Sequence, residues 1–212
     1  MKLATHRISS GFSLVEMAVV LVIVALLLGG LLPSVFSQAE QQRINETRRY
    51  LDEIRNALIG YAQIYGTLPC PATSVYGAVN YGVADSTCTN PVSNNYLPWK
   101  TLGVNETDAW GGKWLYRVDP AFASSVPFTL STATSTTMQI QDSAGNVITS
   151  STERPIAIIF STGKDLVANG QNGGSFDAIY QSDVPTSSFD DIMVWISRPR
   201  LFYRMVAAGK LP

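Results

Sequence analysis

Few side chains of this sequence are of the types that carry out catalysis or hold a metal. The 212 residues include one histidine, His6, and two cysteines, Cys70 and Cys88, beside 16 acidic residues. A zinc centre needs three or four His, Cys or carboxylate ligands, and a Ser-His-Asp or Cys-His device needs a histidine in the folded domain. His6 lies in a short polar leader. We therefore expect that the chain is not an enzyme.

Paired carboxylates are the remaining option for acid–base chemistry, and Asp190 and Asp191 are adjacent. Adjacent residues of a strand point to opposite faces of the sheet, which argues against a cooperating pair. The formal net charge is −1, whereas binding to nucleic-acid phosphates favours a basic excess, so we expect no nucleic-acid partner. We interpret the basic C-terminal run as a solvated face; it consists of Arg198, Arg200, Arg204 and Lys210.

Glu16 is unusual among the acidic residues because it lies at the start of a long apolar segment. It precedes the segment 17–32, which contains no charged and no hydroxyl side chain, and about 20 helical residues span the apolar core of a bilayer. Lys2 and Arg7 lie before this segment, which predicts a cytoplasmic N-terminus and an exported remainder. A carboxylate in such a helix costs about 2.5 kcal/mol or more, so Glu16 is expected to have a partner.

Two simpler interpretations of this segment compete. A secretory signal peptide would use Ser37-Gln38-Ala39 as its small-x-small cleavage site, and a plain single-pass anchor would keep the whole segment. Neither interpretation gives Glu16 a role.

The residues Gly11-Phe12-Ser13-Leu14-Val15-Glu16, followed by the apolar run, resemble the processing signature of type IV prepilins and pseudopilins. The resemblance implies cleavage between Gly11 and Phe12 by a membrane prepilin peptidase and methylation of the new N-terminus at Phe12. Glu16 then stands at the fifth mature position, where it would neutralise the N-terminal amine of a neighbouring subunit. Pro33 stands where many pilins carry a helix-bending proline.

The elements that carry these residues follow from the hydrophobic pattern. One helical face recurs beyond Pro33 and consists of Ile44, Leu51, Ile54, Leu58, Ala62 and Tyr65. This pattern predicts a transmembrane helix at 12–33 and an amphipathic helix at 34–65. Together with the resemblance, it implies a leader at 1–11, a helix at 12–33 that can serve as a filament core, and a periplasmic pilin-like head at 66–212 into which the amphipathic helix continues. Gly66 is expected to end the helix. The alternative is two helices joined at Gly29-Gly30 and Pro33.

The head is richer in Gly, Ser, Thr, Asn and Pro, and short β-like runs replace the helical period. We expect strands at 114–118, 155–161 and 192–197, a hairpin formed by 138–141 and 147–149, and a terminal helix at 199–208 that ends at Gly209. The predicted fold class is α+β, with a long N-terminal helix packed on a small, mostly antiparallel sheet.

Cys70 and Cys88 enclose a polar loop with little apolar surface to bury. In an exported head a disulfide between them is the expected state, worth about 3 kcal/mol in the chain-entropy model. A reactive thiol is the alternative, although the mature chain has no histidine to activate it.

Two head segments also resemble major pseudopilins of type II secretion. The stretch 108–116 is similar to their Asp-x-Trp-Gly segment, and 161–165 with Asp190 and Asp191 is similar to their terminal β-loop. The resemblance implies a calcium ion held by Asp165, Asp190 and Asp191, since calcium binds six to eight oxygens. Ordinary turn hydrogen bonding by Asp and Asn is the alternative, and the insertion 178–188 separates this chain from the family loop.

The function expected is that of a filament subunit, minor or accessory, in a type IV pilus or a type II secretion pseudopilus. Its expected partners are prepilin peptidase, other pilin or pseudopilin subunits, an inner-membrane assembly platform and membrane lipid. Its expected location is the bacterial inner membrane, with a single pass and a periplasmic head, and then the filament. The alternative is a membrane-anchored exported binding protein or adhesin that is not built into a filament.

Overall fold

The structure is a computed structural model that describes residues 11, 13–73, 76–88, 96–173 and 178–211. Within α1, the side chains of residues 28–36 lie outside the described set. The chain divides into two compact units, Met1–Gln42 and Arg43–Pro212. The second unit contains both sheets and therefore positions most of the polar side chains of interest.

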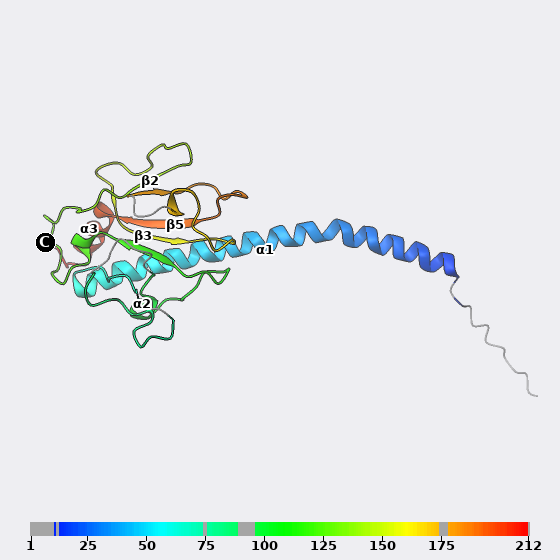
Figure 1. Cartoon of the computed structure of the whole chain (residues 1–212), viewed down its shortest axis with the longest axis horizontal. Helices are drawn as coiled ribbons and strands as arrows, with labels where there is room; N and C mark the ends of the chain where they lie inside the picture. Colours follow the sequence, from blue (N-terminus) through cyan, green and yellow to red (C-terminus); the bar gives the residue numbers. More distant parts are fainter. Residues whose placement is uncertain (1–10, 12, 74–75, 89–95, 174–177, 212) are drawn as a thin grey trace, which may run out of the picture. The chain divides into compact units, whose positions relative to one another are not determined.

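Helix α1 runs over Leu14–Tyr65 as one element (Figure 1). It continues through positions 29, 30 and 33, so the two-helix alternative is not what the backbone adopts. The bend predicted at Pro33 depends on residues whose side chains are outside the described set. Gly66 ends the helix as expected: its φ is +74°, and its N–H donates to the carbonyl of Ala62 at 2.8 Å. Glycine is favoured there because a side chain is strained at this φ.

The larger sheet has three antiparallel strands in the order β1-β3-β5, which span Leu115–Val118, Pro155–Ser161 and Ile192–Ser197. These strands confirm the three predicted from apolar runs. Every residue of β3 is buried. A strand buried on both faces reads as a continuous apolar run, which explains why PIAIIFS was recognisable in the sequence.

The predicted hairpin around residues 142–146 forms only in part. The turn closes with a hydrogen bond from Asp142 N–H to the carbonyl of Asn146 at 3.0 Å. Residues 147–149 add an isolated bridge and backbone hydrogen bonds to the carbonyl of Ile140, but they form no strand. Ile140 N–H donates to the Thr149 hydroxyl at 2.9 Å, so a side chain takes the place of a strand carbonyl. Strand β2, Gln139–Gln141, instead pairs in parallel with β4, Ile179–Gln181. Strand β4 lies in the insertion, where the sequence predicted none.

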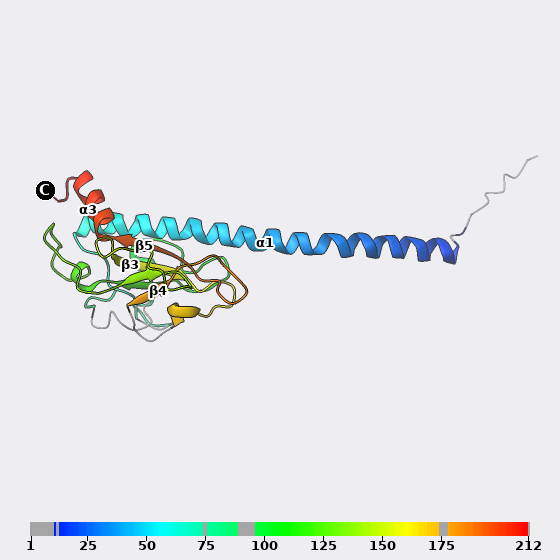
Figure 2. The same cartoon turned by 90° about the horizontal axis from the view of Figure 1, so that it is seen from above.

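The core lies between the sheet and the second part of α1, which run side by side in Figures 1 and 2. One face of the helix contributes fully buried side chains, among them Leu51, Ile54, Leu58 and Ala62. They pack in one cluster with strand residues that include Val118, Ile156 and Ile196. The opposite face of β3 packs Ile158 and Phe160 against Met138 beside the smaller sheet. The α+β class predicted from the pattern is therefore the observed one.

Helix α3, Arg198–Ala207, follows β5 directly and packs beside the end of α1 (Figures 1 and 2). Its Leu201, Phe202 and Met205 are buried, and Gln63 of α1 donates to the carbonyl of Arg204 at 3.1 Å. The predicted terminal helix is thus confirmed to within a residue. The remaining helical elements are short: α2 at Trp99–Leu102, and 3-10 turns at Pro120–Phe122 and Gly170–Gly173.

Candidate functional site

The start of α1 carries the residues that the sequence placed at a processing site. Gly11 is exposed, and Phe12 lies outside the described residues. Ser13 precedes the helix and closes a reciprocal pair with Glu16: the Glu16 N–H donates to Ser13 Oγ at 3.2 Å, and the Ser13 N–H donates to Glu16 Oε2 at 3.1 Å. This is a capping box, which satisfies two amides that the first helical turn leaves free. Glu16 therefore has a partner within its own chain.

The first turns of α1 expose their apolar side chains. Every residue from Leu14 to Leu27 is exposed, although most of them are Val, Leu, Ile or Met. An exposed apolar surface of this kind marks contact with lipid or with another protein. Among the described residues, however, no helix offers a stretch that is both long and apolar enough to cross a membrane.

Cys70 and Cys88 form a disulfide, with their Cα atoms 5.2 Å apart. The bond closes the loop predicted from the sequence and leaves no free thiol among the described residues. The reactive-thiol alternative is therefore wrong for this pair.

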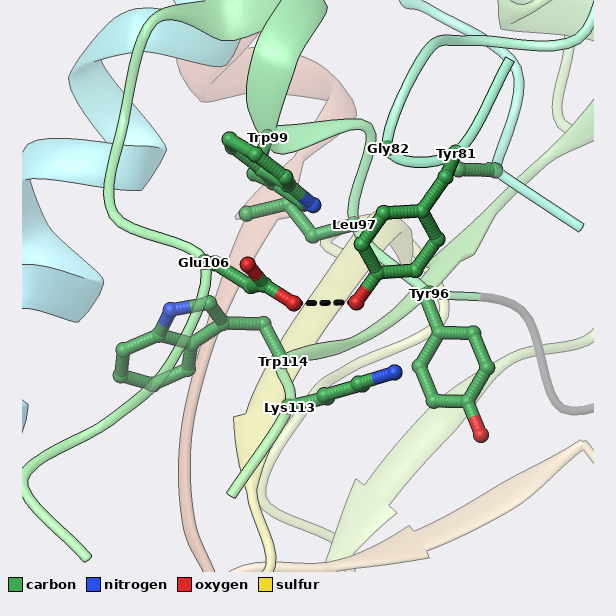
Figure 3. Close-up of a pocket in the computed structure, with 9 residues that line it drawn as sticks. Tyr81, Gly82, Tyr96, Leu97, Trp99, Glu106, Lys113 and Trp114 are labelled. Atoms are coloured by element: carbon green, nitrogen blue, oxygen red, sulfur yellow. Dashed lines mark hydrogen bonds between the residues drawn. The ribbon is translucent and has the colours of Figure 1, made fainter. Parts of the chain in front are cut away.

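Tyr81 of the disulfide-closed loop and Tyr96 beyond it lie beside Lys113, a residue of the stretch 108–116 that resembles pseudopilins (Figure 3). Lys113 Nζ lies 4.8 Å, 5.3 Å and 5.9 Å from the ring centres of Tyr81, Tyr96 and Tyr76. Tyr81 donates its hydroxyl to Glu106. Burial, and then this hydrogen bond, raises the pKa of Tyr81, so the phenol stays neutral near pH 7. The pocket lined by Tyr81, Tyr96 and Lys113 encloses about 10 Å³, because the lysine and the rings fill it. Room for about one water molecule does not support a sugar or peptide pocket.

The two head segments that resemble pseudopilins are joined by hydrogen bonds. Ser161 at the end of β3 donates its hydroxyl to Asp108 at 2.5 Å, and the other oxygen of Asp108 accepts N–H groups from Trp110 and Gly112. Asp108 is buried, and buried carboxylates need such donors. This aspartate fixes the Asp-x-Trp-Gly turn to the loop that begins at Ser161.

The carboxylates proposed as calcium ligands surround that same loop. Asp190 accepts the N–H groups of Lys164 and Asp165 at 2.6 Å and 3.2 Å. Asp191 accepts from the N–H of Asn169 at 2.9 Å and from the amide of Asn172 at 2.8 Å. Asp165 accepts from Val167 N–H and from the Asn169 side chain. Turn hydrogen bonds thus occupy one or both oxygens of each acid.

Asp190 and Asp191 each keep a second oxygen, Oδ1, that is buried and accepts no hydrogen bond among the described residues. Burial, with the charges of Asp190 and Asp165, raises the pKa of Asp191 to about 6 despite the hydrogen bonds from Asn169 and Asn172. An oxygen without a donor is what a cation would satisfy. Yet no three acidic, His or Cys side chains of the described residues come together in a group that could hold a metal ion.

Gly163 allows the loop to approach Asp190. Its φ is +64°, and a Cβ at this position would lie 2.5 Å from the Asp190 carboxyl carbon. No larger residue fits without moving Asp190, so the loop geometry depends on this glycine.

Sequence reasoning missed three of these contributors: Ser13, Asn169 and Asn172. The capping box was readable, because Ser13 and Glu16 have the S-x-x-E spacing before an apolar run. The two asparagines had no such signal, since only the folded loop brings them to Asp190 and Asp191.

Comparison with protein families matches the prokaryotic N-terminal methylation motif to residues 6–32. This is the motif of prepilin-type proteins, so it supports a pilin or pseudopilin, and the matched range includes Gly11, Phe12 and Glu16. The match includes no residue of the head. No curated protein and no solved structure matches the chain.

Proposed function

We propose that this protein is a structural subunit of a type IV pilus or a type II secretion pseudopilus. The observation that carries the proposal is the methylation motif at residues 6–32, which begins a helix whose apolar side chains are exposed from Leu14 to Leu27. A signal peptide or plain anchor needs no such motif. Prepilin peptidase would cut after Gly11 and methylate Phe12, and the subunit would assemble through its N-terminal helix.

Glu16 has two roles in this proposal. In the isolated chain it closes the capping box with Ser13. In the filament its carboxylate would meet the N-terminal amine of a neighbouring subunit. A buried amine and carboxylate stabilise an assembly mainly relative to leaving either charge alone, so the pair would enforce the register between subunits.

The proposed location is the bacterial inner membrane, with the N-terminus in the cytoplasm and the head in the periplasm, and then the filament. The Cys70–Cys88 disulfide supports an oxidising compartment for the head. The partners are prepilin peptidase, other pilin or pseudopilin subunits, the inner-membrane assembly platform and lipid. The chain would have no catalytic activity of its own, and its length and extra loops favour a minor or accessory subunit.

Calcium remains part of the proposal for the head. The buried Oδ1 atoms of Asp190 and Asp191 are available for a cation, and Asp165 is the third side chain. Because hydrogen bonds within the loop already hold it together, we expect calcium to add stability to a formed loop. Thermal unfolding measured in calcium and again in chelator tests this expectation, since an ion bound only by the native state raises the melting temperature.

The processing step is tested by the intact mass of the membrane-extracted protein. A chain that begins at methylated Phe12 is the expected result. A chain that begins at Glu40 would show a signal peptide, and an unprocessed Met1 in cells that contain the peptidase would show a plain anchor.

Two substitutions separate the roles of Glu16. Glu16→Gln keeps a side chain that can close the capping box but removes the charge, whereas Glu16→Ala removes both. We expect both variants to insert into the membrane and both to enter filaments about tenfold less well, which corresponds to about 1.4 kcal/mol. Normal incorporation of Glu16→Gln would show that the cap, and not the charge, is what assembly uses.

A further inference from the structure

A pocket of about 270 Å³ opens in the head between α1 and the start of β5. Its polar lining holds three carboxylates, Asp52, Asp183 and Asp191, and one guanidinium, Arg48. Its apolar lining includes Ile192 and Val194. The excess of acids over bases makes the pocket suited to a cationic group on an apolar stem.

Two of these carboxylates have unused capacity for such a group. Asp191 is only 3% exposed; its Oδ2 accepts from Asn169 and Asn172, whereas its Oδ1 is buried without any hydrogen-bond donor. Hydrogen bonds from Ser143 hold the pKa of Asp183 below its usual range, so Asp183 is an anion at neutral pH. Asp52 differs, because it already pairs with Arg55 at 2.6 Å. The charges of Asp183 and Asp191 together favour a cationic partner from outside the chain.

The outer face of α3 presents the complementary chemistry. Arg200 and Arg204 are exposed and one helical turn apart, and Tyr203 between them is 73% exposed. Arg198 is not available in the same way: it donates to the carbonyls of Leu130 and Thr132 and lies over the Phe202 ring. Arg200 and Arg204 therefore lie on the exposed side of the helix, away from the head core.

The acidic pocket and the basic helix lie at opposite ends of the head. Along α1, Arg48 lines the pocket and Gln63 contacts α3, a separation of about 22 Å at 1.5 Å per residue. Along the sheet, β5 begins at Ile192 in the pocket wall and ends at Ser197, immediately before α3. The lengths of α1 and β5 both separate α3 from the pocket, so α3 of one chain cannot enter the pocket of the same chain.

We propose that the pocket lined by Asp183 and Asp191 receives an exposed arginine of α3, Arg200 or Arg204, from a second copy of this chain. The guanidinium would donate to the carboxylate of Asp183, as arginine does with carboxylate oxygens, and the nearby charge of Asp191 would strengthen the attraction. Tyr203 would lie against the apolar wall of the pocket. The contact is heterologous, because each copy offers its pocket at one end and its helix at the other.

A heterologous contact whose two faces lie at opposite ends propagates into an open chain of subunits instead of closing a dimer. This inference rests on the proposed filament function and adds the head contact to it. The contact also requires that two copies of this subunit are neighbours in the filament.

Disulfide crosslinking in cells tests the contact with the full-length chain. Ser182 lines the pocket and Tyr203 is exposed on α3, so the double variant Ser182→Cys/Tyr203→Cys is expected to give a ladder of dimers, trimers and longer products on a non-reducing gel. Each single variant alone gives no ladder. The matched control Ser150→Cys/Tyr203→Cys, which uses an exposed serine outside the pocket lining, gives none either.

Charge variants in the crosslinking background test the chemistry. Arg200→Glu/Arg204→Glu is expected to lower the yield of ladder about tenfold, whereas Arg200→Lys/Arg204→Lys lowers it less than about threefold because the charges remain. Asp191→Asn, which keeps the shape and the accepting oxygen, is expected to lower the yield severalfold. Asp183→Lys should restore part of the yield in the Arg200→Glu/Arg204→Glu chain, and thermal unfolding checks that each head is folded.

The outcomes separate this contact from the filament proposal. If the double-cysteine chain is processed and enters filaments but gives no ladder of crosslinked products, the contact is overturned and the filament function stands. A dimer from Tyr203→Cys alone, with no longer products, shows a symmetric contact and also overturns it. An N-terminus that is never processed at Phe12 overturns the filament function, and this head contact with it.

Discussion

Two stretches of helix α1 differ in whether their apolar side chains are buried. In residues 43–65 of α1, most apolar side chains recur on one face and are buried against the sheet, with Leu51 fully buried, whereas Tyr65, predicted on the same face, is 59% exposed. In residues 14–27, apolar side chains cover all sides and every one is exposed, Leu21 to 65%. The head stretch, 43–65, is amphipathic and has a partner in its own chain, whereas the first stretch along the chain, 14–27, is not amphipathic and has none among the described residues.

The difference indicates where each stretch gains its stability. Burial of the head stretch belongs to folding, because its sheet partner is part of the same unit. The apolar stretch before it stays exposed in the single chain, so its burial belongs to a later event such as entry into lipid or a filament. The head should therefore fold without the filament, but the filament should not form without the first stretch.

A matched pair of leucines tests this division most strongly. Leu51→Ala removes a fully buried side chain and is expected to destabilise the head by about 3–4 kcal/mol. Leu21→Ala removes an exposed one and is expected to change that stability by less than about 0.5 kcal/mol. Chemical denaturation of the full chain in detergent, followed by tryptophan fluorescence, measures both. Equal effects would show that the first stretch also belongs to the folding unit.

The disulfide gives the head a second source of stability that the N-terminal stretch lacks. Replacement of both cysteines, Cys70→Ser/Cys88→Ser, is expected to lower the free energy of unfolding by about 3 kcal/mol. Denaturation of the wild-type chain with reductant should approach the same value, and the variant should not respond to reductant. A variant as stable as the oxidised chain would mean that the loop is held by its aromatic cluster instead.

The buried acid of the head makes its stability depend on pH. Because the folded-state pKa of Asp191 is raised to about 6, the unfolded chain loses this proton first as pH rises. The contribution of Asp191 should therefore become less favourable by about 2 kcal/mol between about pH 4 and pH 6, and change little above that range. Asp191→Asn does not titrate, so in chelator the stability of the wild type should fall relative to Asp191→Asn across this range. Parallel pH profiles would contradict the shift.

The capping box supplies the smallest effect, and it concerns only the first stretch. Ser13→Ala removes the acceptor for the Glu16 N–H and is expected to cost the first turn about 1 kcal/mol. Hydrogen exchange of the Glu16 amide should accelerate about fivefold, and Ser13→Thr, which keeps a hydroxyl, should exchange nearly as the wild type does. Head stability should not change, because Leu51 and the sheet are untouched.

Much of the fold was predictable because its strongest signals are local. The apolar run of β3, the helical period from Leu51 to Ala62 and the terminal helix each persist long enough to be read from the sequence. Strand β4 was missed, since Ile179–Gln181 is short and pairs with a strand about forty residues away. The predicted second strand of the hairpin, 147–149, does not form. The Ile140 N–H donates to the Thr149 hydroxyl, where in a hairpin it would donate to a backbone carbonyl of the partner strand.

The candidate sites divide in the same way. The N-terminal motif was predictable, because its residues are close in sequence, and the family comparison matches it at residues 6–32; the roles of Gly11, Phe12 and Glu16 stay predictions. For the acidic loop, the sequence indicated Asp165, Asp190 and Asp191 but not their asparagine partners. The pocket lined by Asp183 and Asp191 was not predicted at all, since α1 and β5 contribute to it from distant parts of the chain.

The sequence by itself determined the processing motif, the apolar helix with its single acid, the disulfide pair and the α+β class. These depend on residue types at short spacing, and each pattern persists whatever the rest of the chain does. Only the tertiary structure decided that Glu16 closes a cap with Ser13, that Asp191 is buried with one oxygen unpartnered, and that the acidic pocket and basic α3 lie at opposite ends of the head. Burial and hydrogen-bond partners depend on which surfaces pack together, and packing brings together residues that the linear sequence keeps apart.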